Sequence, residues 1–277
     1  YLWGGIFIVD SAPVSSFKYC EFRHAFFAEY APGHESMGAI EFDNGIINVR
    51  SCVFENNLAA LVTKNLQSDI LVYDCKFISF ENTYPPPYPN SAFMGFQLAH
   101  DYVPEQNYQV TVAKCYFTGN ASRGSGGSYT DNLFLNNFYD NFNVRYGEDS
   151  EKASENGTFC NYGNVIINGY GGSGCSSGAV GDIAFARRNI LYKDNSSEAI
   201  LTLSSSGYGT NYISDNLAYG RIQVPIKPRP SATTHFNNNI IESYIGQPFV
   251  IEPWVYDDSS SQVYIYNNLV SYIGSAT

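Results

Sequence analysis

Six cysteines are the residues of this 277-residue sequence whose spacing most directly suggests chemistry. Four of them are followed two residues later by phenylalanine, and they are Cys20, Cys52, Cys75 and Cys115. None belongs to a Cys-x-x-Cys pair with a nearby histidine, which is the usual spacing of a zinc site, so no metal site is expected. Cys160 and Cys175 lie in a glycine- and serine-rich region, and they are the pair that an oxidising compartment would join in a disulfide.

Short catalytic motifs give no further assignment. The sequence has no Gly-x-Ser-x-Gly elbow, no phosphate-binding loop, no His-Glu-x-x-His and no glycine-rich dinucleotide motif. Its four histidines are scattered along the chain at positions 24, 34, 100 and 235. Motif matching therefore assigns no reaction to the chain.

The four Cys-x-Phe segments belong to a longer repeated pattern, apolar-x-apolar-x-x-Cys-x-Phe. Ile47 and Val49, for example, precede Cys52. Alternating apolar residues predict a strand with one buried face, and the two-residue break before the cysteine predicts a corner. The pattern continues with asparagine in place of cysteine, and the predicted positions are Asn136, Asn164, Asn189, Asn216, Asn239 and Asn268. Together these segments make ten copies at intervals of 21 to 40 residues.

Ten alternating, β-branched and aromatic repeats predict a solenoid made of strands. An earlier apolar segment accompanies most copies, and these segments are 5–10, 38–43, 59–64, 93–98, 141–146, 199–203, 220–224 and 248–252. We therefore expect an all-β fold, a right-handed single-stranded parallel β-helix of about ten coils with three short strands each. A Cys/Asn ladder would run along one corner, where asparagine tolerates left-handed backbone and its amide can bond the residues above and below. The whole chain, 1–277, is expected to form this one domain, as part of a larger chain or assembly.

The repeated frame Val-x-Ile-x-x-[Cys/Asn]-x-[Phe/Ile/Leu] resembles the repeats of the right-handed parallel β-helix, or pectate-lyase-like, superfamily, over essentially the whole chain. The opening segment WGGIFIVDSAPVSSFKYCEFRHA is similar to repeats of secreted and cell-surface bacterial proteins. The resemblance implies a fold that serves enzymes, adhesins and viral spikes alike. In enzymes of the superfamily the site lies on the outward face of the first strand. Aligned here, that face would present Glu41, Asp43, Lys64, Gln97, His100, Asp101, Asn143 and Arg145.

Two reactions would suit such a face. A polysaccharide lyase needs a cation to neutralise a uronate and a base to remove the adjacent proton. Lys64 or Arg145 could supply the cation, and His100 or Lys64 the base. A glycoside hydrolase needs two carboxylates at a controlled separation, which Glu41, Asp43 and Asp101 could supply. The galacturonase-like boxes and the Arg-x-Pro-x-x-Arg pattern of pectate lyases are absent, however, and a polar outward face is also what any β-helix shows.

Two long insertions interrupt the repeat. The segment 78–93 is rich in proline and tyrosine, and exposed tyrosines on a rigid scaffold suit the binding of sugars or proteins. We therefore expect glycan or partner binding at Tyr84, Tyr88 and Tyr102, together with Glu41 and Asp101. The acidic segment 145–159 offers Glu148, Asp149 and Glu151 to Ca²⁺, but their spacing fits no calcium loop, and no cofactor is expected.

Composition limits the remaining function classes. The net charge is −11 with no basic cluster, which argues against nucleic-acid binding. No apolar run is long enough to span a membrane. The sequence has neither an initiator Met nor a signal-peptide pattern at Tyr1, so we expect a mature product or a piece of a longer chain, and either would suit a secreted or cell-surface protein. Neither end shows a capping helix, which favours end-to-end stacking or a continuing chain. Two functions remain, an extracellular structural or adhesive β-helix with a carbohydrate or protein partner, and a carbohydrate-active enzyme.

Overall fold

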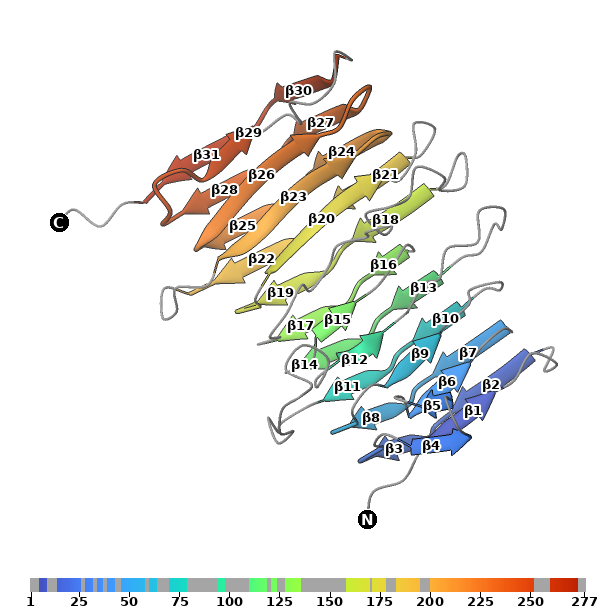
Figure 1. The fold of residues 1–277 in the computed structure, drawn as a ribbon. Coiled ribbons are helices and arrows are strands. Elements are labelled where there is room, and N and C mark those ends of the chain that lie inside the picture. The colour runs from blue at the N-terminus through green and yellow to red at the C-terminus, as the bar shows by residue number, and fades with distance from the viewer. Residues whose placement is uncertain are drawn as a thin grey trace.

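Short parallel strands, stacked one coil above another, make up the described part of the chain (Figure 1). The structure is a computed structural model, and it describes residues 5–8, 14–25, 28–31, 34–36, 39–42, 46–57, 60–63, 70–78, 94–97, 110–118, 121–123, 128–135, 158–169, 171–177, 183–194, 200–251 and 260–273. No helix occurs among these residues. None of them, accordingly, lies in a helix that could span a membrane.

The strands form three sides of an elongated coil. Side 1 consists of three sheets, whose strands are β1 (Ile6–Ile8), β6 (Ile40–Phe42), β9 (Leu61–Thr63); β12 (Met94–Gln97), β15 (Ala121–Arg123); and β20 (Gly171–Ser177), β23 (Leu201–Gly207), β26 (Ile222–Pro228), β29 (Phe249–Ile251). Side 2 is one ten-stranded sheet of β2 (Val14–Lys18), β7 (Ile46–Arg50), β10 (Ile70–Tyr73), β13 (Val110–Ala113), β16 (Ser128–Thr130), β18 (Thr158–Tyr162), β21 (Ile183–Arg187), β24 (Thr210–Ser214), β27 (Thr233–Asn237) and β30 (Gln262–Tyr266). Side 3 is a second ten-stranded sheet of β3 (Glu21–Arg23), β8 (Val53–Glu55), β11 (Lys76–Ile78), β14 (Tyr116–Thr118), β17 (Leu133–Leu135), β19 (Val165–Ile167), β22 (Ile190–Lys193), β25 (Leu217–Gly220), β28 (Ile240–Ser243) and β31 (Leu269–Tyr272).

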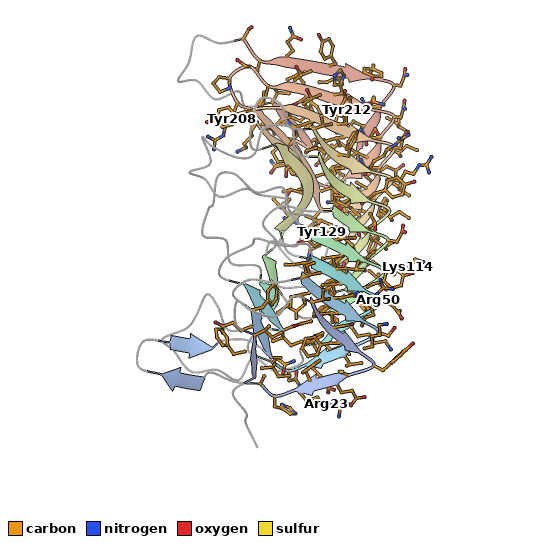
Figure 2. The ribbon with its side chains drawn as sticks, turned by 90° about the vertical axis from the view of Figure 1, so that its right-hand side faces the viewer. Arg23, Arg50, Lys114, Tyr129, Tyr208 and Tyr212 are labelled. Atoms are coloured by element: carbon orange, nitrogen blue, oxygen red, sulfur yellow. The ribbon has the colours of Figure 1, made fainter. Side chains whose placement is uncertain are left out.

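Pairing within each side is parallel and follows the order of the coils. On side 2, for example, Val72 lies in register with Val49 of the preceding coil and Val112 of the following one. Ten strands on each of two sides confirm a parallel β-helix of ten coils with three strands per coil. The only antiparallel pair described is a hairpin of β4 (Ala28–Ala31) and β5 (His34–Ser36), seen as two blue arrows beside the coils in Figure 2.

Side 1 was predicted less completely than the other two sides. Seven of the eight predicted apolar segments overlap a strand of side 1: five contain the whole strand, and 199–203 and 220–224 cover only the first residues of β23 and β26. The eighth, 141–146, lies outside the described residues. Two strands were missed, β15 and β20, because their sequences ASR and GGSGCSS show no apolar alternation.

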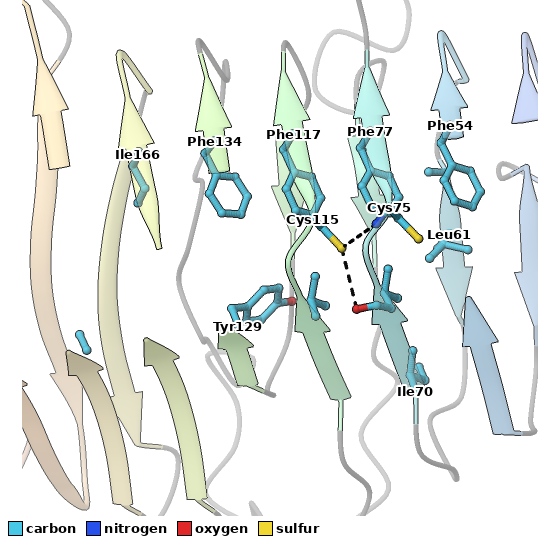
Figure 3. Packing of buried hydrophobic residues seen from close by; sticks show 14 of the residues in the cluster. Phe54, Leu61, Ile70, Cys75, Phe77, Cys115, Phe117, Tyr129, Phe134 and Ile166 are labelled. Carbon is cyan, nitrogen blue, oxygen red and sulfur yellow. Dashed lines mark hydrogen bonds between the residues drawn. The ribbon is translucent and has the colours of Figure 1, made fainter. Parts of the chain in front are cut away.

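The interior of the early coils is a stack of phenylalanine rings (Figure 3). Phe22, Phe54, Phe77, Phe117 and Phe134 occupy the same inward position of successive coils. Their ring centroids are 4.9, 5.0, 4.7 and 4.6 Å apart, and their planes lie within 12° of parallel. Ile166, Leu191, Ala218 and Ile241 continue the column in the later coils, all of them buried. Each buried ring of this size contributes about 1.5–3 kcal/mol of apolar burial.

The predicted corner ladder is present and is held by side-chain amides. In coil 7, Oδ1 of Asn189 accepts hydrogen bonds from the backbone N–H and from Nδ2 of Asn164, at 3.0 and 3.3 Å. Its own Nδ2 donates to the carbonyl of Asn161 at 2.9 Å and to Oδ1 of Asn216 at 3.0 Å. The same pattern links Asn216 to Asn239 and Asn239 to Asn268. Each buried amide is thus satisfied by the coils on either side of it.

One ladder position was predicted wrongly. The residue between Cys115 and Asn164 is Asn132, whose Oδ1 accepts the Cys115 N–H at 2.8 Å and whose N–H donates to Asn164 at 2.9 Å. The sequence prediction placed Asn136 there, a residue that lies outside the described ones. The reason is register: Asn132-Leu-Phe134 matches the Cys-x-Phe frame and puts Phe134 in the ring stack, whereas Asn136 follows the strand.

Cysteine makes a weaker version of the same rung. The N–H of Cys52 approaches Sγ of Cys75 at 3.5 Å, and the N–H of Cys75 approaches Sγ of Cys115 at 3.4 Å. Sγ of Cys115 also contacts the carbonyl of Val72, at 3.8 Å, in the place where an asparagine Nδ2 would donate. Cys20, Cys52, Cys75 and Cys115 are all free thiols, as the parallel stacking of their side chains predicts.

The backbone reason given for asparagine at the corner was wrong. The left-handed residue is the one before the ladder residue. In seven coils it is neither asparagine nor glycine, and Tyr19, Ser51, Asp74, Lys114, Asp131, Arg188 and Asp215 have φ between 48 and 58°. In the other three coils the position is filled by Gly163, Asn238 and Asn267. The ladder residue itself keeps an ordinary backbone. The ladder position therefore favours an amide or a thiol because these groups form hydrogen bonds between coils. The preceding residue adopts the left-handed backbone conformation that the turn requires.

Candidate binding site on the outer face

Most of the residues predicted for catalysis or binding lie outside the described part of the chain. These are Asp43, Lys64, His100 and Arg145 for catalysis, and Tyr84, Tyr88, Asp101 and Tyr102 for glycan or partner binding. The acidic segment with Glu148, Asp149 and Glu151 also lies outside it. Cys160 and Cys175 lie in β18 and β20, but their side chains are outside the description, so their disulfide stays a prediction.

Glu41 does not belong to a solvent-facing stripe. Its side chain is fully buried, and so are Ile40 and Phe42 on either side of it in β6. In the sheet it lies between Phe7 of the preceding coil and Val62 of the following one. The prediction of an outward, glycan-binding Glu41 is therefore wrong, because this strand is covered on both faces.

A column of stacked rings marks the outer face of side 2 in coils 7 to 10. We define the aromatic column as Phe185, Tyr212, His235 and Tyr264, which are in register on β21, β24, β27 and β30. Successive ring centroids are 5.2, 4.8 and 4.9 Å apart, and successive planes are inclined by 14°, 8° and 11°. Tyr264 is 45% exposed and the other three rings are half-buried. Figure 2 shows Tyr212 among the later strands, with Lys114 and Arg50 further down the stack.

Ring stacking decides which part of each ring meets solvent. Because the rings lie face to face along the axis of the coils, neighbouring rings cover most of their faces and their edges point outward. The column therefore presents phenol hydroxyls from Tyr212 and Tyr264 and an imidazole from His235. Such groups recognise a ligand by hydrogen bonds. Only a ring at the end of the column has a face that no neighbouring ring covers, so only there could a ligand stack on a ring.

Polar columns flank the aromatic column on both sides. Thr210, Thr233 and Gln262 form one column at the start of the strands. Asn237 and Tyr266 form the other at their ends, in register with Ser214, which is buried and donates to the Asp215 carboxylate at 3.3 Å. Hydroxyl and amide groups thus recur at the coil spacing of about 4.8 Å in three parallel rows. The Gln262 side chain is already engaged, because the Tyr264 hydroxyl donates to it at 2.8 Å.

The charges near this face neutralise one another. Arg187 forms an ion pair with Asp215 at 2.7 Å, and Asn238 donates to the same carboxylate at 3.2 Å. Partial burial raises the pKa of Asp215, but the hydrogen bonds from Arg187 and Asn238 outweigh it, so the pKa lies below its usual range. The face therefore carries a fixed ion pair at its corner and no net charge from that pair.

One perturbed lysine was not foreseen from the sequence. Lys193 is 5% exposed, and its ammonium donates to the carbonyl of Asn168 at 3.3 Å. Burial lowers the pKa of Lys193, Asp194 opposes that shift, and Arg221 adds to it. Perturbed lysines occur in catalytic sites. Here, however, the contacts of the ammonium are to backbone, and the described residues contain no cluster of His, Cys, Asp or Glu that could hold a metal.

Comparison of the chain with protein-family models, with curated proteins and with solved structures finds no match.

The aromatic column could have been found from the sequence. Each of its rings stands four residues before the ladder asparagine of its coil, as Tyr212 does before Asn216. Reading that one position down the ten copies gives Ser, Asn, Leu, Thr, Ser, Cys, Phe, Tyr, His and Tyr. The repeated frame is defined by its buried positions, so it gives no prediction for this outward one.

Proposed function

We propose that the chain is an extracellular structural or adhesive β-helix that binds a carbohydrate along the outer face of side 2. The observation that carries the proposal is the aromatic column with its two flanking polar columns. Three rows of hydroxyl, amide and imidazole groups on a rigid sheet form a flat array of hydrogen-bonding partners.

The regular spacing of these rows suits a regular polymer. A linear polysaccharide repeats its hydroxyl groups at a fixed interval, so one chain lying along the coil axis would meet equivalent partners at each coil. Tyrosine favours such contacts because it offers a large surface and a hydroxyl at a small cost in side-chain entropy. A protein partner would require a complementary surface of the same regularity.

The charge of the face favours a neutral glycan over a uronate. Arg187 is engaged by Asp215, and the remaining groups of the three rows carry no formal charge when His235 is neutral. An acidic polysaccharide would also be repelled by the net charge of −11. In coils 8 to 10 the outer face of side 2 therefore supports binding without the cation that a lyase needs.

Membership of the pectate-lyase-like superfamily and a secreted or cell-surface location belong to the same proposal. The parallel β-helix, the repeated frame and the composition rich in asparagine, glycine, serine and tyrosine support them. End-to-end assembly into a fibre would suit a structural role.

A panel of neutral and acidic polysaccharides, titrated by calorimetry, tests the proposal. We expect binding of a neutral glycan, and an association constant about fivefold weaker for Tyr212→Ala or Tyr264→Ala, since each loses a hydrogen bond worth about 1 kcal/mol. Tyr192→Ala is the matched control, because Tyr192 is 39% exposed on side 3 and should leave binding unchanged. Equal loss in the control, or no binding of any glycan, would refute the proposal.

The enzymatic alternative has its own readout. New reducing ends, or absorbance at about 235 nm from an unsaturated product, would show a hydrolase or a lyase. Loss of that turnover in Lys64→Ala or Arg145→Ala would move the function to side 1. We expect no turnover with the glycan that binds side 2.

A further inference from the structure

The outer face of side 3 carries a continuous row of exposed aliphatic side chains. We define the apolar stripe as Leu133, Val165, Ile190, Leu217, Ile240 and Leu269, one from each of coils 5 to 10 and all in register. Ile190, Leu217 and Ile240 are each 45% exposed, and Leu269 is 57% exposed. Each stripe residue directly follows the ladder asparagine of its coil, so the spacing is that of the ladder. Single exposed aliphatic residues are ordinary, but six in one row are not.

The apolar stripe does not extend into the first coils, where charged residues occupy the same position. In coils 1 and 3 the same outward position holds Glu21 and Lys76, with Val53 between them in coil 2. The neighbouring outward row begins with Arg23, which forms ion pairs with Glu21 at 3.2 Å and with Glu55 at 3.1 Å. Beside the stripe that row is largely apolar, and its members in coils 5 to 8 are Leu135, Ile167, Tyr192 and Tyr219. The stripe position is therefore charged in coils 1 and 3 and apolar in coils 5 to 10, while the neighbouring row continues with Glu242 in coil 9 and Ser271 in coil 10.

We infer that the apolar stripe is the contact surface of a homodimer, in which two copies lie side by side with antiparallel axes. The occupant follows from the chemistry of the face. The six stripe residues themselves contain no ionisable group, so covering them with an identical stripe removes no charge of the stripe from water, and Glu242 of coil 9 is the charged side chain of the neighbouring row beside it. Two flat sheets also meet naturally face to face, at a separation of about 10 Å.

The area of the stripe agrees with a reversible dimer. Six strands about 4.8 Å apart make a patch about 29 Å long, and two outward rows make it about 14 Å wide. That footprint corresponds to about 500 Å² of accessible surface per copy, or about 1,000 Å² in total, which is the lower limit for a specific interface. A concentration-dependent dimer is therefore expected, and not an obligate one.

The charged coils fix the register. With antiparallel axes centred between coils 7 and 8, Ile190 faces Leu217 of the second copy, and Val165 faces Ile240. Coils 1 to 4 of each copy then extend beyond the contact, so Glu21 and Lys76 stay in solvent. Parallel axes would instead place equal charges of coils 1 and 3 opposite each other, which is unfavourable.

The net charge predicts how salt affects the dimer. Each copy carries −11, so long-range repulsion opposes association at low ionic strength. Salt screens this repulsion and leaves the apolar contact in place. Association should therefore strengthen between about 0.02 and 0.3 M salt, opposite to a contact made by ion pairs. The inference concerns side 3, so it does not depend on glycan binding at side 2.

Sedimentation equilibrium tests the inference on the intact chain. The wild type should move reversibly between a mass near 30.7 kDa and twice that mass as its concentration rises. Leu217→Lys places a charge at the centre of the contact and should raise the dissociation constant about 100-fold. Val53→Lys is the matched control, because Val53 has the same outward position on side 3 but lies outside the stripe. It should leave the dissociation constant unchanged, and circular dichroism should show both variants folded.

A pair of complementary variants tests the register. Val165→Lys and Ile240→Glu should each be monomeric alone, while an equimolar mixture should regain the dimer, because the two substituted positions face each other in the antiparallel arrangement. A wild type that stays monomeric up to about 1 mM would overturn the dimer and leave the stripe to a different partner. A mixture that stays monomeric, or an equal effect of Val53→Lys, would overturn the contact surface described here.

Discussion

Substitution of Asn189 measures what the corner ladder contributes to stability. Its fully buried side chain makes four hydrogen bonds, two with Asn164 and one each with Asn161 and Asn216. Leucine has a similar volume and makes none of them. The exchange therefore separates hydrogen bonding from packing.

The expected loss follows from the groups left without a partner. In Asn189→Leu the backbone N–H of Asn164 loses the bond to Oδ1, and the carbonyl of Asn161 loses the bond from Nδ2. Oδ1 of Asn216 keeps the backbone N–H of residue 189, at 2.9 Å, and Nδ2 of Asn164 keeps the Tyr129 carbonyl. One buried N–H left without its acceptor costs about 1–3 kcal/mol and one lost hydrogen bond costs about 0.5–1.5 kcal/mol, so the free energy of unfolding should fall by about 1.5–4.5 kcal/mol.

Cysteine at the same position should cost less. Cys75 and Cys115 already accept a backbone N–H from the preceding coil and contact a carbonyl there. Asn189→Cys keeps weaker forms of those two bonds, so it should be more stable than Asn189→Leu by at least about 1 kcal/mol. Asn237→Leu is the control: Asn237 points outward from β27, and its exchange should stay within about 0.5 kcal/mol of the wild type.

Urea unfolding followed by circular dichroism gives the free energies, and hydrogen exchange shows where stability is lost. Because each coil contacts only its neighbours, exchange in Asn189→Leu should rise in coils 6 to 8 and stay unchanged near Val49 in coil 2. A leucine variant as stable as the wild type, or a cysteine variant no better than leucine, would refute the account of the ladder.

Four further outcomes follow from individual residues. Tyr19 is 84% exposed with φ of 57°. In thermal unfolding, Tyr19→Gly should therefore be neutral to stabilising, and Tyr19→Val should lower the free energy of unfolding by about 1–2 kcal/mol. The reverse order of stability would contradict the left-handed backbone at this residue. A Cβ on Gly220 would lie 1.6 Å from the Lys193 carbonyl oxygen, so Gly220→Ala should cost roughly 2–4 kcal/mol or prevent folding, and a stable variant would show a different strand spacing. Both polar atoms of the Asn211 side-chain amide are buried without a hydrogen-bond partner among the described residues. Asn211→Leu should therefore raise the free energy of unfolding by about 1–3 kcal/mol. A lower free energy of unfolding in this variant would show that the amide does have a partner. Burial raises the pKa of the Cys52 thiol to about 11, so iodoacetamide at pH 8 should modify the partly exposed Cys20 and spare Cys52, as peptide mass spectrometry would show; modified Cys52 in the native protein would contradict its burial.

The buried frame could be predicted because it repeats. Alternation identified the strands of side 2, and the Cys-x-Phe spacing identified the ladder and the ring stack. Asn132 and Asn136 both fit the repeated pattern, and the prediction took Asn136. The stacking of Phe134 on Phe117 and the hydrogen bond from Cys115 to Asn132 show that Asn132 is the ladder residue. The left-handed residue could not be predicted from its type, since tyrosine, lysine and arginine all occupy it. Backbone hydrogen bonds between coils impose that conformation on whatever side chain is present.

The candidate surfaces were harder to predict than the frame. Alternation shows which residues point outward, but not whether another part of the chain covers them, and Glu41 is covered. The aromatic column and the apolar stripe appear only when outward positions are compared between coils. The strands β15 and β20 lack apolar alternation, and only their parallel pairing with neighbouring coils defines them.

Methyl-labelled NMR tests the stacking of consecutive coils most directly. Val49, Val72 and Val112 are buried, in register on three consecutive coils, and 23 and 40 residues apart in sequence. In a deuterated sample the nuclear Overhauser spectrum should join the methyls of Val49 to those of Val72, and those of Val72 to those of Val112. It should not join Val49 directly to Val112, which lie two coils, or about 10 Å, apart. Absence of both neighbouring contacts, or a strong contact between Val49 and Val112, would contradict the stacked coils.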